Sequence, residues 1–296
     1  MSQVYSFHTL DVFTEQIFGG NPLAVFPDAD GLTASQMQAI AQELNLSETV
    51  FVLPAENKDC DFRLRIFTPR SELPFAGHPT VGTAYLLAHL GKVPSLQSVI
   101  NLEEGVGNVP VSLNWADSQI QTTALQAAQL PIFSDAPSLN LADLLSLQPE
   151  DFAEEYSAAV ISCGLPFFYI PLKTKEAVDR CVLNMSLWQQ AIAETDAQNV
   201  YVFAVQEKQI YSRMFAPGLG IAEDPATGSA ATSLAGHLHQ YIDPETPEQT
   251  WQITQGVKMG RPSELQLLFE TKNSQLTKIA VGGSSVLVSR GEMRVS

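Results

Sequence analysis

The sequence predicts an α+β protein with two related halves, each a curved sheet around one central helix. Three observations predict this class: short β-rich runs outnumber helical ones, strands and helices do not alternate regularly, and a group of motifs occurs twice in the same order. A regular alternation of strand and helix would instead indicate a doubly wound parallel sheet.

The expected strands are runs rich in β-branched and aromatic residues that end at proline, glycine or polar positions. In chain order they are "VYSFHTLDVF", "PLAVFP", "TVFVLP", "DFRLRIFTP", "AAVISCG", "PFFYIPL", "NVYVFAV" and "YSRMFAP". The expected helices are residues 32–46, 79–91, 143–147, 185–194 and 225–241.

The first helix has signals at both of its ends. Thr33 can cap the helix at its start, and Asn45 can end it in left-handed geometry. Between them Met37, Ile40 and Leu44 share one face, which is the period of an amphipathic helix.

An internal repeat organises the chain. The pattern R-x-F-x-P occurs at Arg65 and again at Arg213, followed by "HPTVGTA" from His78 and by "DPATGSA" from Asp224, so that 224 − 78 = 146 positions separate the two. Two weaker matches in the same order, "GGNPLAVF" with "SCGLPFFYI" and "SETVFVL" with "QNVYVFAV", support a duplication.

The repeat divides the chain into two domains. We expect an N-terminal domain over residues 1–118 and a C-terminal domain over residues 119–284, and the last strand, about 285–296, is a candidate to complete the first domain. Residues 116–140 are rich in Ser, Gln and Pro, which is typical of a linker.

Composition excludes several classes of partner. Sixteen Lys and Arg against 32 Asp and Glu give a net charge of −16, which repels nucleic-acid phosphates and anionic lipid. The three cysteines form no CxxC pair and are expected to be reduced core residues. Without an apolar run of membrane-spanning length or a signal-peptide pattern, we expect a cytoplasmic protein.

Candidate site residues lie at the starts of two predicted helices. If these helices begin at Pro79 and Pro225, then His78 and Asp224 occupy N-cap positions beside free backbone N–H groups. Two such helix starts facing each other across the cleft between the domains would hold a small anion, and we expect a carboxylate.

His78 and Glu48 are the candidates for proton transfer. The positive end of a helix dipole opposes protonation of His78, and a neutral imidazole can accept or donate a proton. Glu48 precedes an apolar strand, where burial would raise its pKa. Ordinary helix capping also explains Asp224, and a solvated charge at a turn also explains Glu48.

Other enzyme classes lack their motifs. Ser229 has no G-x-S-x-G environment, no complete G-x-G-x-x-G fingerprint is present, and no lysine follows a glycine-rich phosphate loop. His237 and His239 are two residues apart near a helix end, where they diverge. We therefore expect no metal and no nucleotide cofactor.

Taken together, four motifs resemble a known family. "LNLSETVFV", "FTPRSELPFAGHPTVGTA", "EDPATGSA" and "QGVKMGRPSEL" are similar to the signature motifs of the PhzF family, the phenazine-biosynthesis-like isomerases with the diaminopimelate epimerase fold. The resemblance implies two similar domains, each a barrel-like mixed sheet wrapped around a central helix, an active site between them, and a homodimer.

The resemblance also implies roles for individual residues. Glu48 of "SET", His78 of "AGHP" and Asp224 of "EDPATGS" match the catalytic positions. In the mechanism that we expect, Asp224 holds His78. The substrate-binding candidates that the same motifs supply are Gly77, Gly228, Ser229, Ser47 and Asn21.

The expected function is that of an isomerase in which Glu48 moves a proton between carbons of a small unsaturated carboxylate. The cysteines that related epimerases place on either side of the substrate carbon are absent from the helix-start motifs. Two alternatives remain: an amino-acid racemase or epimerase, and a protein that only binds a small carboxylate.

Overall fold

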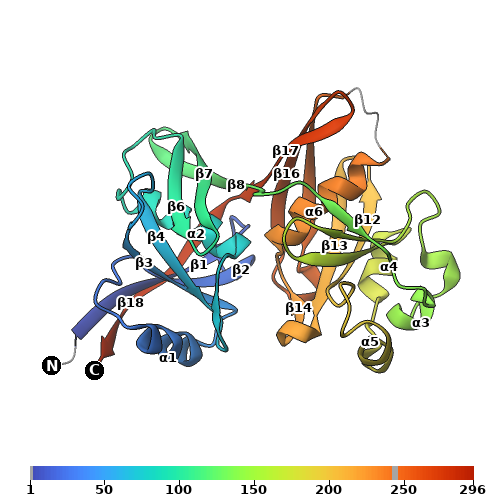
Figure 1. Cartoon of the computed structure of the whole chain (residues 1–296), viewed down its shortest axis with the longest axis horizontal. Coiled ribbons are helices and arrows are strands. Elements are labelled where there is room, and N and C mark those ends of the chain that lie inside the picture. Colours follow the sequence, from blue (N-terminus) through green and yellow to red (C-terminus); the bar gives the residue numbers. More distant parts are fainter. Residues whose placement is uncertain (1–2, 242–245) are drawn as a thin grey trace. The chain divides into compact units, whose positions relative to one another are not determined.

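The structure is a computed structural model that describes residues 3–241 and 246–296 (Figure 1). Contacts within the chain divide it into two compact units. The first comprises the chain up to Gln126 together with Gly282–Ser296, and the second is Ala127–Val281. Among the described residues no helix is both long and apolar enough to cross a membrane.

The first unit is a mixed sheet around a helix. Its elements are β1 (Gln3–Val12), β2 (Asn21–Phe26), α1 (Ala34–Leu44), β3 (Glu48–Pro54), β4 (Phe62–Phe67), β5 (Glu72–Leu73), α2 (Gly77–His89), β6 (Val99–Glu104), β7 (Gly107–Ala116), β8 (Gln119–Gln126) and β18 (Ser285–Val295). Strand pairing gives the order β18-β1-β2-β3-β4-β6-β7-β8, with β5 also on β4.

Helix α2 is the centre of this unit. It contacts β1, β2, β3, β7, β8 and β18, and ten of its residues are buried. A helix that is apolar on all sides needs a partner on every side, and the curved sheet supplies it. The sheet therefore wraps the helix, as Figure 1 shows for α2.

The second unit repeats this plan. Its elements are β9 (Ile132–Ser134), α3 (Leu141–Leu145), β10 (Ala159–Ser162), β11 (Pro166–Pro171), α4 (Lys175–Arg180), α5 (Met185–Ala191), β12 (Val200–Gln206), β13 (Gln209–Ala216), β14 (Ile221–Asp224), α6 (Gly228–His239), β15 (Glu248–Gln255), β16 (Ser263–Lys272) and most of β17 (Gln275–Gly283), with 3₁₀ turns at Pro149–Asp151, Pro217–Leu219 and Val257–Met259. Helix α6 contacts β10, β11 and β16.

The same sequence of pairings occurs in both units, which confirms the predicted duplication. Strand β2 runs parallel to β3 as β11 does to β12, and β4 runs parallel to β6 as β13 does to β15. The strand that closes each unit differs in origin: β1 pairs with the C-terminal β18, whereas β10 pairs with β9, its predecessor in the chain.

Around the central helices, equivalent positions of the two halves are not separated by the 146 residues that the sequence motifs predicted. Glu72 forms two hydrogen bonds with Arg65, and Glu223 forms the same two with Arg213. Since α2 and α6 begin five residues after Glu72 and Glu223, "ELPFAG" matches "EDPATG" at a separation of 223 − 72 = 151, and the separation of 146 was wrong.

The pattern P-x-x-G explains the mistaken register. It occurs twice in succession in the first half, at Pro74 and at Pro79, whereas in the second half only Pro225 carries it directly before the central helix. Letters alone fit Pro225 to either proline. The strand pairing and the helix starts match it to Pro74, and His78 and Asp224 are then not equivalent positions.

Helix α1 confirms its predicted caps. The Thr33 hydroxyl accepts a hydrogen bond from the Gln36 backbone N–H, the Gln36 side chain accepts one from the Thr33 N–H, and Asn45 has φ 50° in the left-handed region. This reciprocal pair is the capping box that Thr33 and Gln36 predict.

The expected linker at 116–140 was wrong in its first part. Residues 119–126 form β8, which pairs antiparallel with β7 and places the division between units after Gln126 instead of after residue 118. Asp117 and Ser118 make the connecting turn with φ of 50° and 62°. Two successive residues with positive φ are typical of a tight hairpin, which Asp tolerates well.

Candidate functional site

The first unit brings Glu48 and His78 into contact. Glu48 is the first residue of β3 and pairs with Leu23 on the parallel strand β2. Its Oε2 atom lies 3.3 Å from Nε2 of His78, and the two residues are only 9 % and 7 % exposed. A carboxyl and an imidazole at this distance form a pair that can share and exchange a proton.

Burial changes the acidity of Glu48. Removal from water disfavours the charged carboxylate and raises the pKa of Glu48 to about 7, while a hydrogen bond from Ser47 opposes part of that rise. A carboxyl with this pKa exists in both protonation states near neutral pH. This confirms the expectation that burial raises the pKa of Glu48, and the solvated-turn interpretation was wrong.

Two of the predicted binding residues lie beside this pair. The Ser47 hydroxyl donates to Oδ1 of Asn21 at 3.3 Å, and Asn21 is fully buried at the start of β2. Because β2 and β3 are parallel neighbours, their first residues lie at the same edge of the sheet. Asn21, Ser47 and Glu48 therefore form one polar cluster with His78.

The position of His78 differs from the N-cap that the sequence predicted. Helix α2 begins at Gly77, its N-cap is Ala76, and His78 is its second residue. Ala76 has no side chain that could cap, so the first-turn N–H groups of α2 have no side-chain acceptor from the N-cap. Gly77 is the first residue of this turn.

The second unit carries the remaining candidates. Asp224 is the last residue of β14, and α6 begins at Gly228, so Asp224 is not an N-cap either. Its Oδ2 atom accepts a hydrogen bond from the Thr227 hydroxyl at 2.5 Å. Gly228 and Ser229 form the first turn of α6, where Thr227 is the N-cap residue without a side-chain cap.

One buried acid near the site escaped the sequence analysis. Glu104 ends β6, is 6 % exposed, and contacts Thr80 in the first turn of α2. Its sequence context, "LEEGVGNV", reads as a solvated turn. The signal that could identify it is the repeat at a separation of 151, which matches Glu104 to the neutral Gln255.

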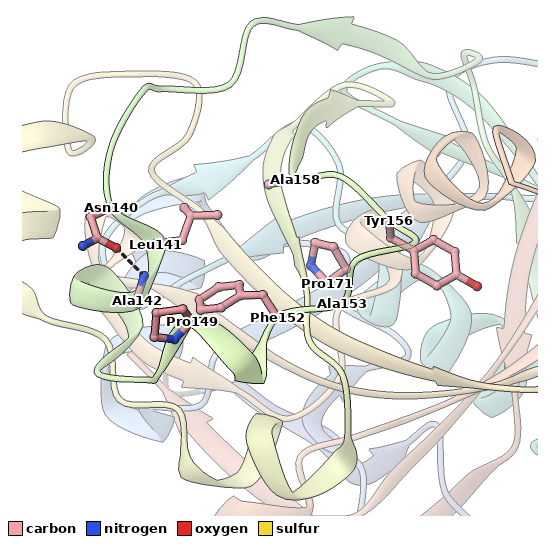
Figure 2. Close-up of a pocket in the computed structure, with 9 residues that line it drawn as sticks. All are labelled: Asn140, Leu141, Ala142, Pro149, Phe152, Ala153, Tyr156, Ala158 and Pro171. Carbon is pink, nitrogen blue, oxygen red and sulfur yellow. Dashed lines mark hydrogen bonds between the residues drawn. The ribbon is translucent and has the colours of Figure 1, made fainter.

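A surface cavity in the second unit has no charged side chain, histidine or cysteine in its lining. It has a volume of about 280 Å³, and Figure 2 shows its lining, which contains no Asp, Glu, Lys, Arg, His or Cys: Asn140, Leu141, Ala142, Pro149, Phe152, Ala153, Tyr156, Ala158 and Pro171. Within residues 3–241 and 246–296 no group of three or more His, Cys, Asp or Glu side chains is arranged to hold a metal ion.

The cysteines form no disulfide, as expected, but only Cys181 is a core residue. Cys60 and Cys163 are partly exposed. Burial raises the pKa of the Cys163 thiol to about 12, which keeps it protonated and unreactive at neutral pH.

Glu48 is expected to lower stability when it ionises. Its folded pKa of about 7 exceeds the ordinary value of 4.5, so the folded state holds the proton more tightly and stability is lost as pH rises from 4.5 to about 7. From about pH 5 to about pH 8.5, Glu48→Gln should gain about 2–3 kcal/mol of unfolding free energy relative to wild type. Urea unfolding at both pH values measures this, and a constant difference would contradict the burial of a titrating carboxyl.

One known family matches nearly the whole chain. The family model of the phenazine biosynthesis-like proteins (PhzC-PhzF) matches residues 10–291. The chain belongs to this family. The match includes Glu48, His78 and Asp224.

Relatives of the phenazine biosynthesis-like family match along nearly their whole length. An uncharacterized isomerase of Mesorhizobium japonicum is 38% identical over 98% of this chain and 99% of its own. A trans-2,3-dihydro-3-hydroxyanthranilate isomerase of Pseudomonas chlororaphis is 35% identical over 95% of this chain and 96% of its own. The crystal structure of a PhzF family protein of Bacillus anthracis superposes with TM-score 0.88 at 26% identity, covering 98% of this chain and 99% of that chain. The family and its named members support isomerase activity for the chain.

Proposed function

We propose that this protein is an isomerase that moves a proton between two carbons of a small unsaturated carboxylate, with Glu48 as the acid and base. The observation that carries the proposal is the buried Glu48 carboxyl, whose pKa is raised to about 7 and whose Oε2 atom lies 3.3 Å from the imidazole of His78. A general base performs best when its pKa lies near the working pH.

In the proposed reaction, ionised Glu48 removes a proton from an allylic C–H bond of the substrate. The electron pair of that bond moves into the conjugated system, and the double bond shifts as negative charge spreads toward the substrate carboxylate. Glu48, now neutral, returns its proton to a different carbon, so no proton is gained or lost overall. His78 faces Glu48 and is assigned to orient this carboxyl and to exchange protons with the substrate.

Binding of the substrate carboxylate is assigned to helix first turns. Gly77 in α2 and Gly228 and Ser229 in α6 present backbone N–H groups that have no partner within their own helix. Asp224, hydrogen-bonded to Thr227, retains the catalytic assignment that the family resemblance implies. Donors already in place for the developing charge supply a large share of the rate enhancement in such sites.

The duplicated fold favours one catalytic acid over two. Thr49 pairs with Phe67 in the first unit and Val200 pairs with Phe215 in the second, so the position equivalent to Glu48 is Asn199. Asn199 is fully buried and its amide donates to the Pro166 carbonyl at 3.0 Å. An amide cannot transfer protons, so a racemase with matched acids in both halves lacks its second group at this position.

Deuterium labelling tests the proposal. The protein is incubated in deuterated water with trans-2,3-dihydro-3-hydroxyanthranilate, the compound that names a relative, and with a panel of small unsaturated carboxylic acids, and NMR follows each C–H signal. We expect a shifted double bond, with hydrogen lost at one carbon and gained at another. Exchange at a single carbon with inversion would instead establish a racemase, and equal binding without exchange in wild type and Glu48→Gln would establish a carboxylate-binding protein.

A further inference from the structure

Glu104 occupies a buried position that the reaction above does not use. Its Oε1 atom lies 2.6 Å from the Thr80 hydroxyl, and that hydroxyl lies 2.7 Å from the carbonyl oxygen of Ala76. Thr80 is fully buried in the first turn of α2, and Ala76 is the N-cap residue of this helix. The three groups join the end of β6 to the helix turn that carries His78.

The hydrogen count in this chain favours a neutral carboxyl. A threonine hydroxyl has one hydrogen, and the Ala76 carbonyl can only accept. When Thr80 donates to Ala76, the short contact to Glu104 is a hydrogen bond only if the carboxyl is the donor. The other oxygen of Glu104, Oε2, is buried, and no described residue offers it a hydrogen bond. An ionised carboxylate left this way would carry a large desolvation cost.

The second unit shows the neutral counterpart. At the separation of 151, Glu104 matches Gln255. The glycine after each of them packs closely against an equivalent proline, because a Cβ added at Gly105 would clash with Pro74 and one added at Gly256 would clash with Pro225. The Gln255 amide donates to the carbonyl of Asp224 at 2.8 Å and to the Thr227 hydroxyl at 3.0 Å.

Gln255 therefore ties the end of its strand to the start of α6, as Glu104 does for α2. In one half this link is made by an amide, which never ionises, and in the other by a carboxyl, which can. A protonated carboxyl and an amide have nearly the same shape, and each can donate one hydrogen bond and accept another.

We propose that Glu104 is held as the neutral acid and is a positioning residue, whose ionisation disturbs the first turn of α2 and moves His78 relative to Glu48. The effect of Glu104 ionisation on activity rests on the proposed isomerase function. Its effect on the position of His78 is independent of that proposal.

The electrostatic surroundings agree with this assignment. Burial raises the pKa of Glu104 to about 8. The cationic side chains of the neighbouring strand β4 are bound to other acids, Arg63 to Glu56 and Arg65 to Glu72.

The other titratable groups near Glu104 do not neutralise it. Helix α2 carries His78, Tyr85 and His89, strand β6 carries Glu103, and strand β7 carries none. His78 faces Glu48, and Glu103 accepts hydrogen bonds from the backbone of the 56–57 turn. Glu104 thus becomes charged only under mildly alkaline conditions.

The test begins with the carboxyl itself. In protein labelled with ¹³C at the glutamate side-chain carboxyl, the resonance that disappears in Glu104→Gln identifies this residue. We expect that resonance at the position of a protonated acid at neutral pH and a titration midpoint near pH 8. A midpoint in the ordinary glutamate range would overturn the proposal, whether or not the protein is an isomerase.

The positioning role has a separate measurement. The ring ¹⁵N resonances of His78 should shift with the Glu104 midpoint in wild type and lose that step in Glu104→Gln, in which the neutral amide retains the link to Thr80. Thr80→Val, which removes the bridging hydroxyl, should shift them at neutral pH. Unchanged His78 resonances across the Glu104 titration would overturn the role.

Activity supplies the last comparison. If the isomerase proposal holds, wild-type kcat/KM falls above about pH 8, by at most about tenfold per pH unit, and Glu104→Gln lacks this alkaline decline while keeping neutral-pH activity. The same decline in both proteins would overturn the link to activity.

Discussion

Glu48→Gln is expected to lower kcat/KM by on the order of a hundred- to ten-thousand-fold, the range that loss of a general acid/base produces. The amide preserves the shape of the side chain and its place at the start of β3, but it cannot accept a proton from carbon. Steady-state kinetics with the substrate identified by the labelling screen measures the loss. The variant should remain folded and be more stable than wild type at alkaline pH.

Glu43→Gln is the matched control, because Glu43 is an exposed acid on α1 and its replacement changes the net charge by the same amount. It should keep wild-type activity. Turnover of Glu48→Gln at the wild-type rate would rule out Glu48 as the proton carrier, and an equal loss in both variants would point to a general charge effect.

His78→Leu is expected to reduce kcat/KM by at least about tenfold and to move the acid limb of the pH profile upward by about one pH unit. The imidazole Nε2 lies 3.3 Å from the Glu48 carboxyl, and a donor there favours the ionised form. Its removal raises the pKa of Glu48, so a higher pH is needed to form the active base. The pH dependence of kcat/KM for both proteins measures the shift.

His78→Gln separates the presence of a donor beside Glu48 from the titration of the imidazole. The glutamine amide can donate to Glu48 without titrating, so this variant should keep the wild-type acid limb even if its rate falls. An acid limb that moves equally in the leucine and glutamine variants would assign the effect to altered packing around α2. An unmoved limb in His78→Leu would contradict the coupling of the two groups.

Local signals in the sequence predicted much of the fold. Thr33 and Asn45 bound α1 as expected, because caps depend only on residues within one turn. The R-x-F-x-P motifs at Arg65 and Arg213 occupy equivalent strands, β4 and β13, because each arginine forms the same pair with a glutamate. These contacts join residues close in the sequence, so motif spacing preserves them.

Long-range contacts were harder to predict. The pairing of His78 with Glu48 depends on the parallel alignment of β2 with β3 and on α2 beginning at Gly77, and neither is written in any single motif. The burial of Glu104 goes with a long-range contact, from the end of β6 to Thr80 in the first turn of α2. Periodicity also gave no signal for β8, since "QIQTTALQ" is as polar as the linker it was taken for.

The pairing of β1 with β18, a strand far along the chain, affects the order in which the two units are completed during synthesis. The edge of β1 is filled by β18, which follows every strand of the second unit in the chain, whereas the second unit draws its strands from one uninterrupted stretch. The first unit is therefore completed only after the second unit has been synthesised, and until then β1 presents an unpaired edge that other strands could occupy. Glu48 and His78 both belong to the first unit, so the sheet that carries this pair is closed only after the second unit has been made.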